Sequence, residues 1–169
     1  MKSQAADLAR LWAPWRSRFL YQRKMRGCIF CRAVRGRDDR RTYVVRRTRH
    51  AFAILNLYPY NNGHLMVVPR RHLPDFSRCT PSELLDLWRL AGRMQALLTR
   101  ALKPHGFNLG INLGRDGGAG IPGHVHIHLV PRWRGDTNFM TAVHGTKVIS
   151  ESLDALYRRL VRNTVQRDS

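Results

Sequence analysis

Acidic residues and long apolar runs are both scarce in this chain of 169 residues. It has 11 Asp and Glu against 30 Lys and Arg, a formal net charge of +19. Charges in that number lie at the surface, so the expected partners are anionic: nucleic acid, phosphorylated small molecules or an acidic membrane surface. No apolar run approaches the roughly 20 residues of a membrane-spanning helix, so no membrane span is expected. The 43% of hydrophobic residues suffices for one folded core.

Cysteine is also scarce, with only Cys28, Cys31 and Cys79 present. An odd count, with no apolar segment after a basic start near Met1, favours a reducing, cytoplasmic setting over a disulfide scaffold. Cys28 and Cys31 form a C-x-x-C pair that fits half of a zinc site, a redox dithiol or an accidental spacing. No strand pattern precedes the pair, as it would in a thioredoxin-like motif, so zinc is favoured, with histidines as the remaining ligands.

Three segments are expected along the chain. Residues 1–27 form a basic arm with interleaved aromatic residues, including Trp12 and Trp15. Such a mixture can stack on nucleic-acid bases, but packing of the tryptophans onto the domain is the favoured interpretation. Residues 28–149 form the main domain, and residues 150–169 form a C-terminal helix and tail.

The main domain shows both strand and helix patterns. Thr80-Pro81-Ser82-Glu83 has the spacing of a capping box and starts a long helix that ends before Pro104. A second helix is expected over about 150–162. Segments rich in β-formers predict strands over 42–45, 51–55, 64–69, 107–113 and 124–130. The chain is therefore expected to be a single α+β domain, with an antiparallel sheet of about five strands, a long helix and a C-terminal helix.

The most informative segment is Gly123-His124-Val125-His126-Ile127-His128-Leu129. In a strand, side chains alternate between faces, so the three histidines should share one face. A histidine-rich strand without chemistry is the plain alternative, but three adjacent imidazoles are costly to bury without partners. Three histidines on one flat strand converge poorly on a single metal ion. The pattern therefore favours different roles for the individual histidines over a metal site made of all three.

A glycine-rich loop, residues 114–123, leads directly into the histidines. By itself it could be a plain flexible connection, and it lacks the spacing of a P-loop. Next to the histidines, its main-chain N–H groups can instead cradle a phosphate. Neutral imidazole is a good nucleophile toward phosphorus near pH 7. The residues therefore predict phosphoryl or nucleotidyl transfer through a phospho-histidine intermediate, with a neighbouring protonated histidine assisting.

The segment His124-Val125-His126-Ile127-His128-Leu129-Val130 resembles the signature of the histidine triad (HIT) superfamily of nucleotide hydrolases and transferases. Asn56, the strand around His64, His72 and the glycine-rich loop lie where that family has its landmarks. The resemblance covers about residues 10–162. Leu11-Trp12-Ala13-Pro14-Trp15-Arg16 and the segment 131–139 resemble the bacterial diadenosine-tetraphosphate phosphorylase branch.

The resemblance implies a role for each histidine. His126, the middle one, is implied as the nucleophile that attacks the α-phosphate, and His128 as a phosphate contact or leaving-group assistant. His124 is implied either to orient the nucleophile or, in zinc-carrying members, to bind the metal. Those members resemble this chain in using a structural Cys₂His₂ set, here Cys28, Cys31, His72 and His124.

The resemblance also implies nucleotide contacts. Asn56 corresponds to a residue on the ribose side, and Asn112 with Gly118, Ala119, Gly120 and Ile121 to phosphate contacts. His64 is either a hydrogen-bonded core residue or part of the nucleotide pocket, and Trp133 either stacks on a base or packs. Gly120 stands where many members have a Gln or Ser, so main-chain N–H groups or Arg115 would contact the phosphate here.

The implied function is cleavage of a phosphoanhydride bond in a dinucleoside polyphosphate such as diadenosine tetraphosphate. A nucleotidyl-histidine intermediate is resolved by inorganic phosphate or by water, and the sequence leaves that choice open. A homodimer or larger homo-oligomer is implied, with the long helix as a candidate interface. The rival hypotheses are a nucleic-acid-associated protein that acts on adenylated ends or binds nucleic acid, and a nucleoside phosphoramidase.

Overall fold

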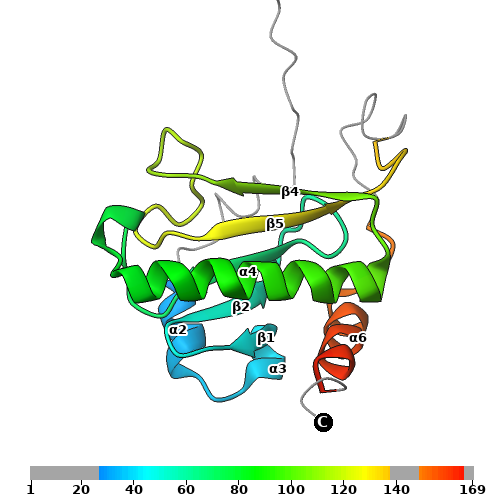
Figure 1. Ribbon diagram of the computed structural model, residues 1–169, viewed down its shortest axis with the longest axis horizontal. Helices are drawn as coiled ribbons and strands as arrows, with labels where there is room; N and C mark the ends of the chain where they lie inside the picture. Colours follow the sequence, from blue (N-terminus) through cyan, green and yellow to red (C-terminus); the bar gives the residue numbers. More distant parts are fainter. Residues whose placement is uncertain (1–26, 138–148, 166–169) are drawn as a thin grey trace, which may run out of the picture.

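A five-stranded antiparallel sheet forms the centre of the molecule, in the order β1-β2-β3-β5-β4 (Figure 1). The computed structural model describes residues 27–137 and 149–165. The strands are β1 (Val44–Arg47), β2 (Ala51–Leu55), β3 (Leu65–Pro69), β4 (Gly106–Ile111) and β5 (Ile127–Arg132). The predicted α+β class and the five strands are confirmed. Most of the predicted arm lies outside the described residues.

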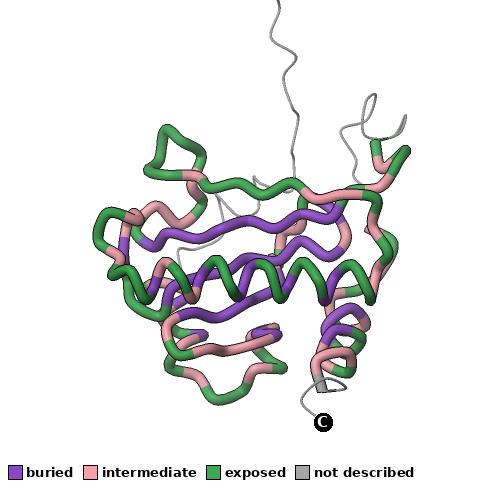
Figure 2. Tube along the Cα trace, viewed as in Figure 1, coloured by how far each residue is buried: buried purple, intermediate pink, exposed green. Residues whose placement is uncertain are grey.

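One face of the sheet is covered by the long helix α4 (Pro81–Leu102), which lies in front of the sheet and runs roughly along β4 and β5 in Figure 1. Thr80 and Glu83 form the predicted capping box at its start. The apolar stripe of α4 packs on alternate residues of β2, β3 and β5, which are all buried (Figure 2). Helix α6 (Leu153–Val165) adds Leu156 and Leu160 to the same core. No helix among the described residues is long and apolar enough to cross a membrane.

The opposite face carries two short helices that the sequence patterns did not predict, α2 (Ile29–Arg35) and α3 (Asp39–Thr42). A short 3-10 turn, η1 (Phe76–Arg78), precedes α4. The core under α2 contains Phe30, Phe52 and Met66. Arg47 holds the end of α2 in place, since its guanidinium donates to the carbonyls of Ala33 and Gly36 at 2.6 and 3.1 Å. Helix α2 is only seven residues long, so tertiary contacts, more than helix propensity, stabilise it.

The strand with the histidines begins later and ends later than predicted. Strand β5 starts at Ile127, so His124 and His126 lie in the extended segment just before it. At the other end, Pro131 does not stop the strand, which continues to Arg132. The carbonyl of Pro131 accepts from the Asn61 side chain at 3.0 Å, instead of from a strand. Pro131 has no backbone N–H, but that N–H would point to the same side as its carbonyl, away from a paired strand. No hydrogen bond between strands is therefore lost at this proline.

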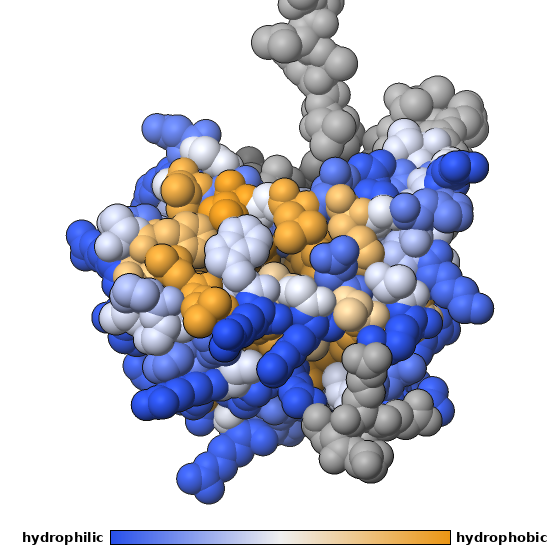
Figure 3. Space-filling view, in the orientation of Figure 1, coloured by the Kyte–Doolittle hydropathy of each residue, from blue (hydrophilic) through white to orange (hydrophobic). Residues whose placement is uncertain are grey.

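The two edge strands of the sheet, β1 and β4, each have a distinctive feature. The register between β1 and β2 shifts between Val44 and Arg46, as in a β-bulge. At the other edge, β4 pairs only with β5, and its residues from Asn108 onward are exposed. Figure 3 shows hydrophobic side chains gathered over β4 and the adjacent part of α4.

Candidate active site

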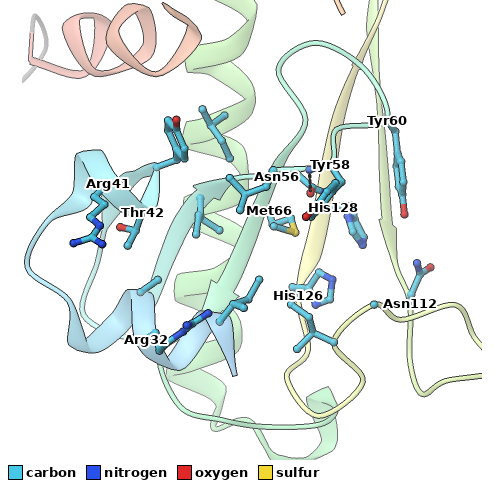
Figure 4. Close-up of a pocket in the computed structure, with 18 residues that line it drawn as sticks. Arg32, Arg41, Thr42, Asn56, Tyr58, Tyr60, Met66, Asn112, His126 and His128 are labelled. Atoms are coloured by element: carbon cyan, nitrogen blue, oxygen red, sulfur yellow. Dashed lines mark hydrogen bonds between the residues drawn. The ribbon is translucent and has the colours of Figure 1, made fainter. Parts of the chain in front are cut away.

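A cavity of about 480 Å³ opens on the α2 side of the sheet, with His126 and His128 in its wall (Figure 4). The rest of the wall comes from α2, α3, β2, the loop after β2 and the glycine-rich loop. Nearly all of these segments precede or follow a strand, so the sheet fixes their relative positions. The sharing of one face by the histidines is confirmed, because Ile127 and Leu129 pack into the core under α4.

The hydrogen bond of His126 defines which of its ring nitrogens can react. Its Nδ1 lies 2.9 Å from the carbonyl oxygen of His124. A carbonyl only accepts, so Nδ1 carries the proton and Nε2 carries the lone pair of the neutral ring. Burial lowers the pKa of His126 below its ordinary value, against the opposing effect of this bond. The ring is therefore neutral at pH 7 and has a free nucleophilic nitrogen.

His128 is oriented by a second buried histidine, His64. The backbone N–H of Tyr60 donates to Nδ1 of His64 at 3.0 Å, so the proton of His64 is on Nε2. Burial lowers the pKa of His64 to about 3, so this ring is neutral. Its Nε2–H then donates to Nδ1 of His128 at 2.9 Å. This places the ring proton of a neutral His128 on Nε2, where it is a donor.

The other walls of the cavity are largely apolar. Ile29 and Ala33 of α2 face Ile54 of β2 and Leu57 of the following loop across it. Asn56 also lines the cavity, and its side-chain oxygen accepts from the Tyr58 N–H at 2.9 Å. Asn56 was expected from the sequence, but these apolar residues were not. They come together because α2 lies beside β2 at the cavity, and no local sequence pattern predicts that position of α2.

Gly120 and Ile121 of the glycine-rich loop line the cavity, together with Asn112 just before the loop. The Asn112 side chain donates to the Gly118 carbonyl at 3.3 Å, which holds the loop closed. Gly118 itself has a φ of 81°, in the left-handed region that favours glycine. Gly118 and Ala119 do not line the cavity wall, and neither does Trp133, whose N–H donates to Asp136 at 3.2 Å. His64 lies behind His128.

Next to the cavity, Cys28, Cys31, His72 and His124 converge, with their ligand atoms all within 4.8 Å of one another. His124 Nε2 lies 2.9 Å from the Pro69 carbonyl and donates to it, so Nδ1 has the lone pair. That Nδ1 lies 3.3 Å from Cys28 Sγ. Burial lowers the pKa of His124 to about 4, which keeps it neutral. The four residues can therefore hold a metal ion.

The metal cluster and the cavity share one structural support. The ring of Phe30, which lies between the two cysteines in sequence, contacts His124 and His126 with centroid distances of 5.3 and 5.1 Å. The fold and site thus define a protein class: an α+β domain with a neutral histidine at a cavity of about 480 Å³, beside four residues that could hold a metal ion.

Comparison with known proteins agrees with this class. The HIT domain family matches residues 37–135, and the chain belongs to that family. It is 37% identical over 158 residues to the AP-4-A phosphorylase of Mycobacterium tuberculosis, covering 89% of this chain and 81% of that protein. It is 38% identical over 93 residues to an asymmetrical bis(5'-nucleosyl)-tetraphosphatase of Schizosaccharomyces pombe, covering 55% of this chain and 50% of that protein.

The fold also matches solved structures. A Zn-bound histidine triad family protein from Mycobacterium smegmatis superposes with a TM-score of 0.68 at 24% identity, covering 84% of this chain and 96% of the other. The predicted membership of the family and its fold are therefore confirmed.

Proposed function

We propose that this chain is an enzyme that cleaves dinucleoside polyphosphates through a nucleotidyl-His126 intermediate. The observation that supports it most is the bond from His126 Nδ1–H to the His124 carbonyl, which leaves Nε2 as a nucleophile at the cavity. Two relatives are named as an AP-4-A phosphorylase and an asymmetrical bis(5'-nucleosyl)-tetraphosphatase, and both names point to dinucleoside polyphosphates as substrates.

The reaction has two steps. In the first, His126 Nε2 attacks the α-phosphorus, an Nε2–P bond forms, and the bond to the bridging oxygen breaks. With diadenosine tetraphosphate the leaving group is ATP, and the Nε2–H of His128 donates a hydrogen bond to the phosphate oxygens. In the second step, inorganic phosphate or water attacks the same phosphorus, and Nε2 leaves. Phosphate yields ADP and water yields AMP.

The nucleotide would lie with its base between the apolar walls of α2 and β2. Asn56 would contact the ribose, and Asn112 with Gly120 and Ile121 the phosphates. Gly120 offers no side chain, so main-chain N–H groups serve here in place of the polar side chain of many relatives. Gly118, Ala119 and Trp133 would contribute through the shape of their loops.

Zinc is the metal proposed for Cys28, Cys31, His72 and His124. Two thiolates and two imidazoles suit a closed tetrahedral zinc site, and the donors lie close enough to share one ion. Bound there, zinc would be structural, since it would join the start of α2 to the segment before β5. The three cysteines form no disulfide with one another, which supports the proposed cytoplasmic location.

A homodimer through β4 and the first half of α4 is also part of the proposal. Leu109 and Ile111 of β4, with Leu85 and Trp88 of α4, are large apolar side chains that are 37–52% exposed. Strand β4 is a sheet edge, and an unprotected edge with apolar neighbours is a template for pairing with a second copy.

The test is to incubate the full chain with diadenosine tetraphosphate, with and without inorganic phosphate, and to separate the products. ATP plus ADP, formed only with phosphate, identifies a phosphorylase, and ATP plus AMP without phosphate identifies a hydrolase. His126→Ala should lower turnover at least about 1,000-fold while the circular dichroism spectrum and metal content stay unchanged. Near-normal turnover by this variant would contradict the proposed nucleophile.

A further inference from the structure

The two thiols of the C-x-x-C pair lie close to each other at the start of α2. Cys28 is the N-cap residue of that helix, and Cys31 belongs to its first turn. Their sulfur atoms, as members of the four-residue set, lie within 4.8 Å of each other. A disulfide has its sulfurs about 2.05 Å apart, so a local movement of the first turn of α2 would join them. The redox dithiol that the sequence left open is therefore compatible with the same pair that can hold a metal ion.

The pair is accessible to solvent on the side of His72. Cys28 and Cys31 are both half-buried, whereas the His72 side chain is exposed. Cys31 Sγ lies 3.3 Å from Nδ1 of His72, at the exposed side of the set. Cys28 Sγ lies 3.3 Å from Nδ1 of His124, which is fully buried. A small oxidant therefore reaches Cys31 first, and Cys28 lies behind it as the second thiol.

A movement at the cysteines would be transmitted to the active site through α2. Phe30, between the two cysteines in sequence, contacts the rings of His124 and His126 at centroid distances of 5.3 and 5.1 Å. Ile29 and Ala33 of the same helix line the active-site cavity. Figure 4 shows α2 along one side of that cavity, with His126 on another side. A rearranged first turn of α2 would therefore alter both the support of His126 and an apolar wall of the cavity.

We propose that Cys28 and Cys31 form a reversible disulfide when they react with a peroxide, and that this bond releases the metal ion and weakens nucleotide binding. A sulfur atom in a disulfide has no thiolate charge, so the oxidised pair no longer supplies two metal ligands. The effect on nucleotide binding rests on the proposed function, whereas the formation of the disulfide does not.

The oxidation has two steps. The Cys31 thiolate attacks one oxygen of hydrogen peroxide, the O–O bond breaks, and the released hydroxide takes up the thiol proton and leaves as water. The Cys28 thiolate then attacks the sulfur of the resulting sulfenic acid, the S–S bond forms, and the second hydroxide leaves as water with the proton of Cys28. The two sulfurs lose two electrons in total, and the peroxide gains them. A metal ion held by both sulfurs keeps them as thiolates, the form that attacks peroxide.

The test is to treat the purified full chain, loaded with zinc, with hydrogen peroxide. Without reductant, the tryptic peptide that contains both cysteines, residues 27–32, should lose the mass of two hydrogen atoms and resist alkylation. About one zinc ion per chain should become available to a chromogenic chelator. The affinity for AMP, measured by calorimetry, should fall at least about fivefold. Dithiothreitol with added zinc should reverse all three changes.

Two variants separate the roles of the cysteines. In Cys28→Ser the second thiol is missing, so peroxide should leave a sulfenic acid on Cys31, which dimedone traps, and no disulfide in this peptide. The matched control is Cys79→Ala, which removes a half-buried thiol outside the four-residue set. It should form the disulfide and release zinc as the wild-type protein does.

Three results would overturn the proposal. The first is zinc release with no disulfide between Cys28 and Cys31, and the second is a loss of AMP affinity that dithiothreitol and zinc do not reverse. The third is a complete disulfide that changes AMP affinity less than about twofold. The proposed function fails separately, if the reduced wild-type protein neither binds AMP nor cleaves diadenosine tetraphosphate, because the disulfide and zinc measurements need no nucleotide.

Discussion

At the scale of single residues, hydrogen bonds to backbone groups determine the chemistry of three histidines. His126 and His124 each donate a ring N–H to a backbone carbonyl, and His64 accepts a hydrogen bond from a backbone N–H. Backbone groups have a fixed donor or acceptor character, so each bond specifies one tautomer. Each ring therefore has its lone pair where its proposed role needs it.

In the proposed reaction His64 would be a positioning residue, because it contacts His128 and does not line the cavity. His64→Phe should lower kcat roughly 10- to 100-fold and change KM less than about threefold, since it removes the donor that fixes the His128 tautomer. His64→Gln offers an acceptor to the Tyr60 N–H and a donor to His128, so it should restore much of the loss. Steady-state kinetics on diadenosine tetraphosphate measures both. An equal loss of kcat in both variants would indicate that His64 acts only by packing and would contradict its positioning role.

At the scale of elements, α2 depends on contacts outside itself. Its N-cap, Cys28, makes no side-chain capping bond, and the helix has only seven residues. A metal ion on Cys28, Cys31, His72 and His124 would tie the helix to the sheet, and α2 supplies a wall of the active-site cavity.

Cys31→Ala should therefore reduce bound zinc from about one ion per chain to nearly none and weaken AMP binding by several-fold. Elemental analysis and calorimetry measure the two effects. Cys79→Ala is the control, because Cys79 is outside the four-residue set. Full zinc content in the Cys31 variant would contradict the proposed ligand set.

The start of α4 is stabilised by Glu83, which serves both the capping box and Arg71. Arg71 donates to its two carboxylate oxygens at 2.7 and 2.8 Å, and the Thr80 N–H donates at 2.8 Å. The bond from Arg71 is the largest influence that lowers the pKa of Glu83, to about 2 from an ordinary 4.5. The folded state thus favours the ionised carboxylate.

Glu83→Gln should lower the free energy of unfolding by about 1 kcal/mol at pH 7. Because the folded pKa is depressed, the stabilisation by Glu83 is complete above about pH 4.5 and is lost as the pH falls toward 2. The difference between the two proteins should shrink over that range. Denaturant titrations at pH 7, 4 and 3 measure it, and a difference that does not depend on pH would contradict the ionic origin.

At the scale of the whole molecule, two surface features stand out: a net charge of +19 and an apolar edge. The apolar edge is the proposed dimer interface. Trp88→Glu should shift the protein from dimer to monomer in sedimentation velocity, because it would bury a charge in the interface. Gln95→Glu adds the same charge to an exposed position of α4 and should leave the dimer intact. A wild-type monomer would contradict the proposal.

The charge of +19 is not explained by the active site, whose proposed reacting groups are imidazoles. The nucleic-acid hypothesis, based on this charge and the aromatic arm, therefore stays a separate proposal, and a salt titration of binding to generic DNA or RNA tests it.

The sequence alone determined what local patterns can encode. Segments rich in β-forming residues predicted the strands, the capping box predicted the start of α4, and the histidine spacing predicted one shared face. The motif also led to the family, and through it to Cys28, Cys31, His72 and His124 as a set. The signals for the strands, the helix start and the shared histidine face each lie within a few residues of sequence. Over that distance the regular geometry of the backbone is enough to place the side chains.

Only the tertiary structure decided what depends on contacts between distant segments. Helix α2 follows no clear pattern, because Arg47 and the core under it stabilise it from outside. The tautomer of His128 depends on a bond between β5 and the segment before β3, 64 residues apart in sequence. Arg46 lies on the α4 side of the sheet only because a bulge shifts the register of β1 against β2. Sequence periodicity does not encode such long-range contacts, and chain packing creates them.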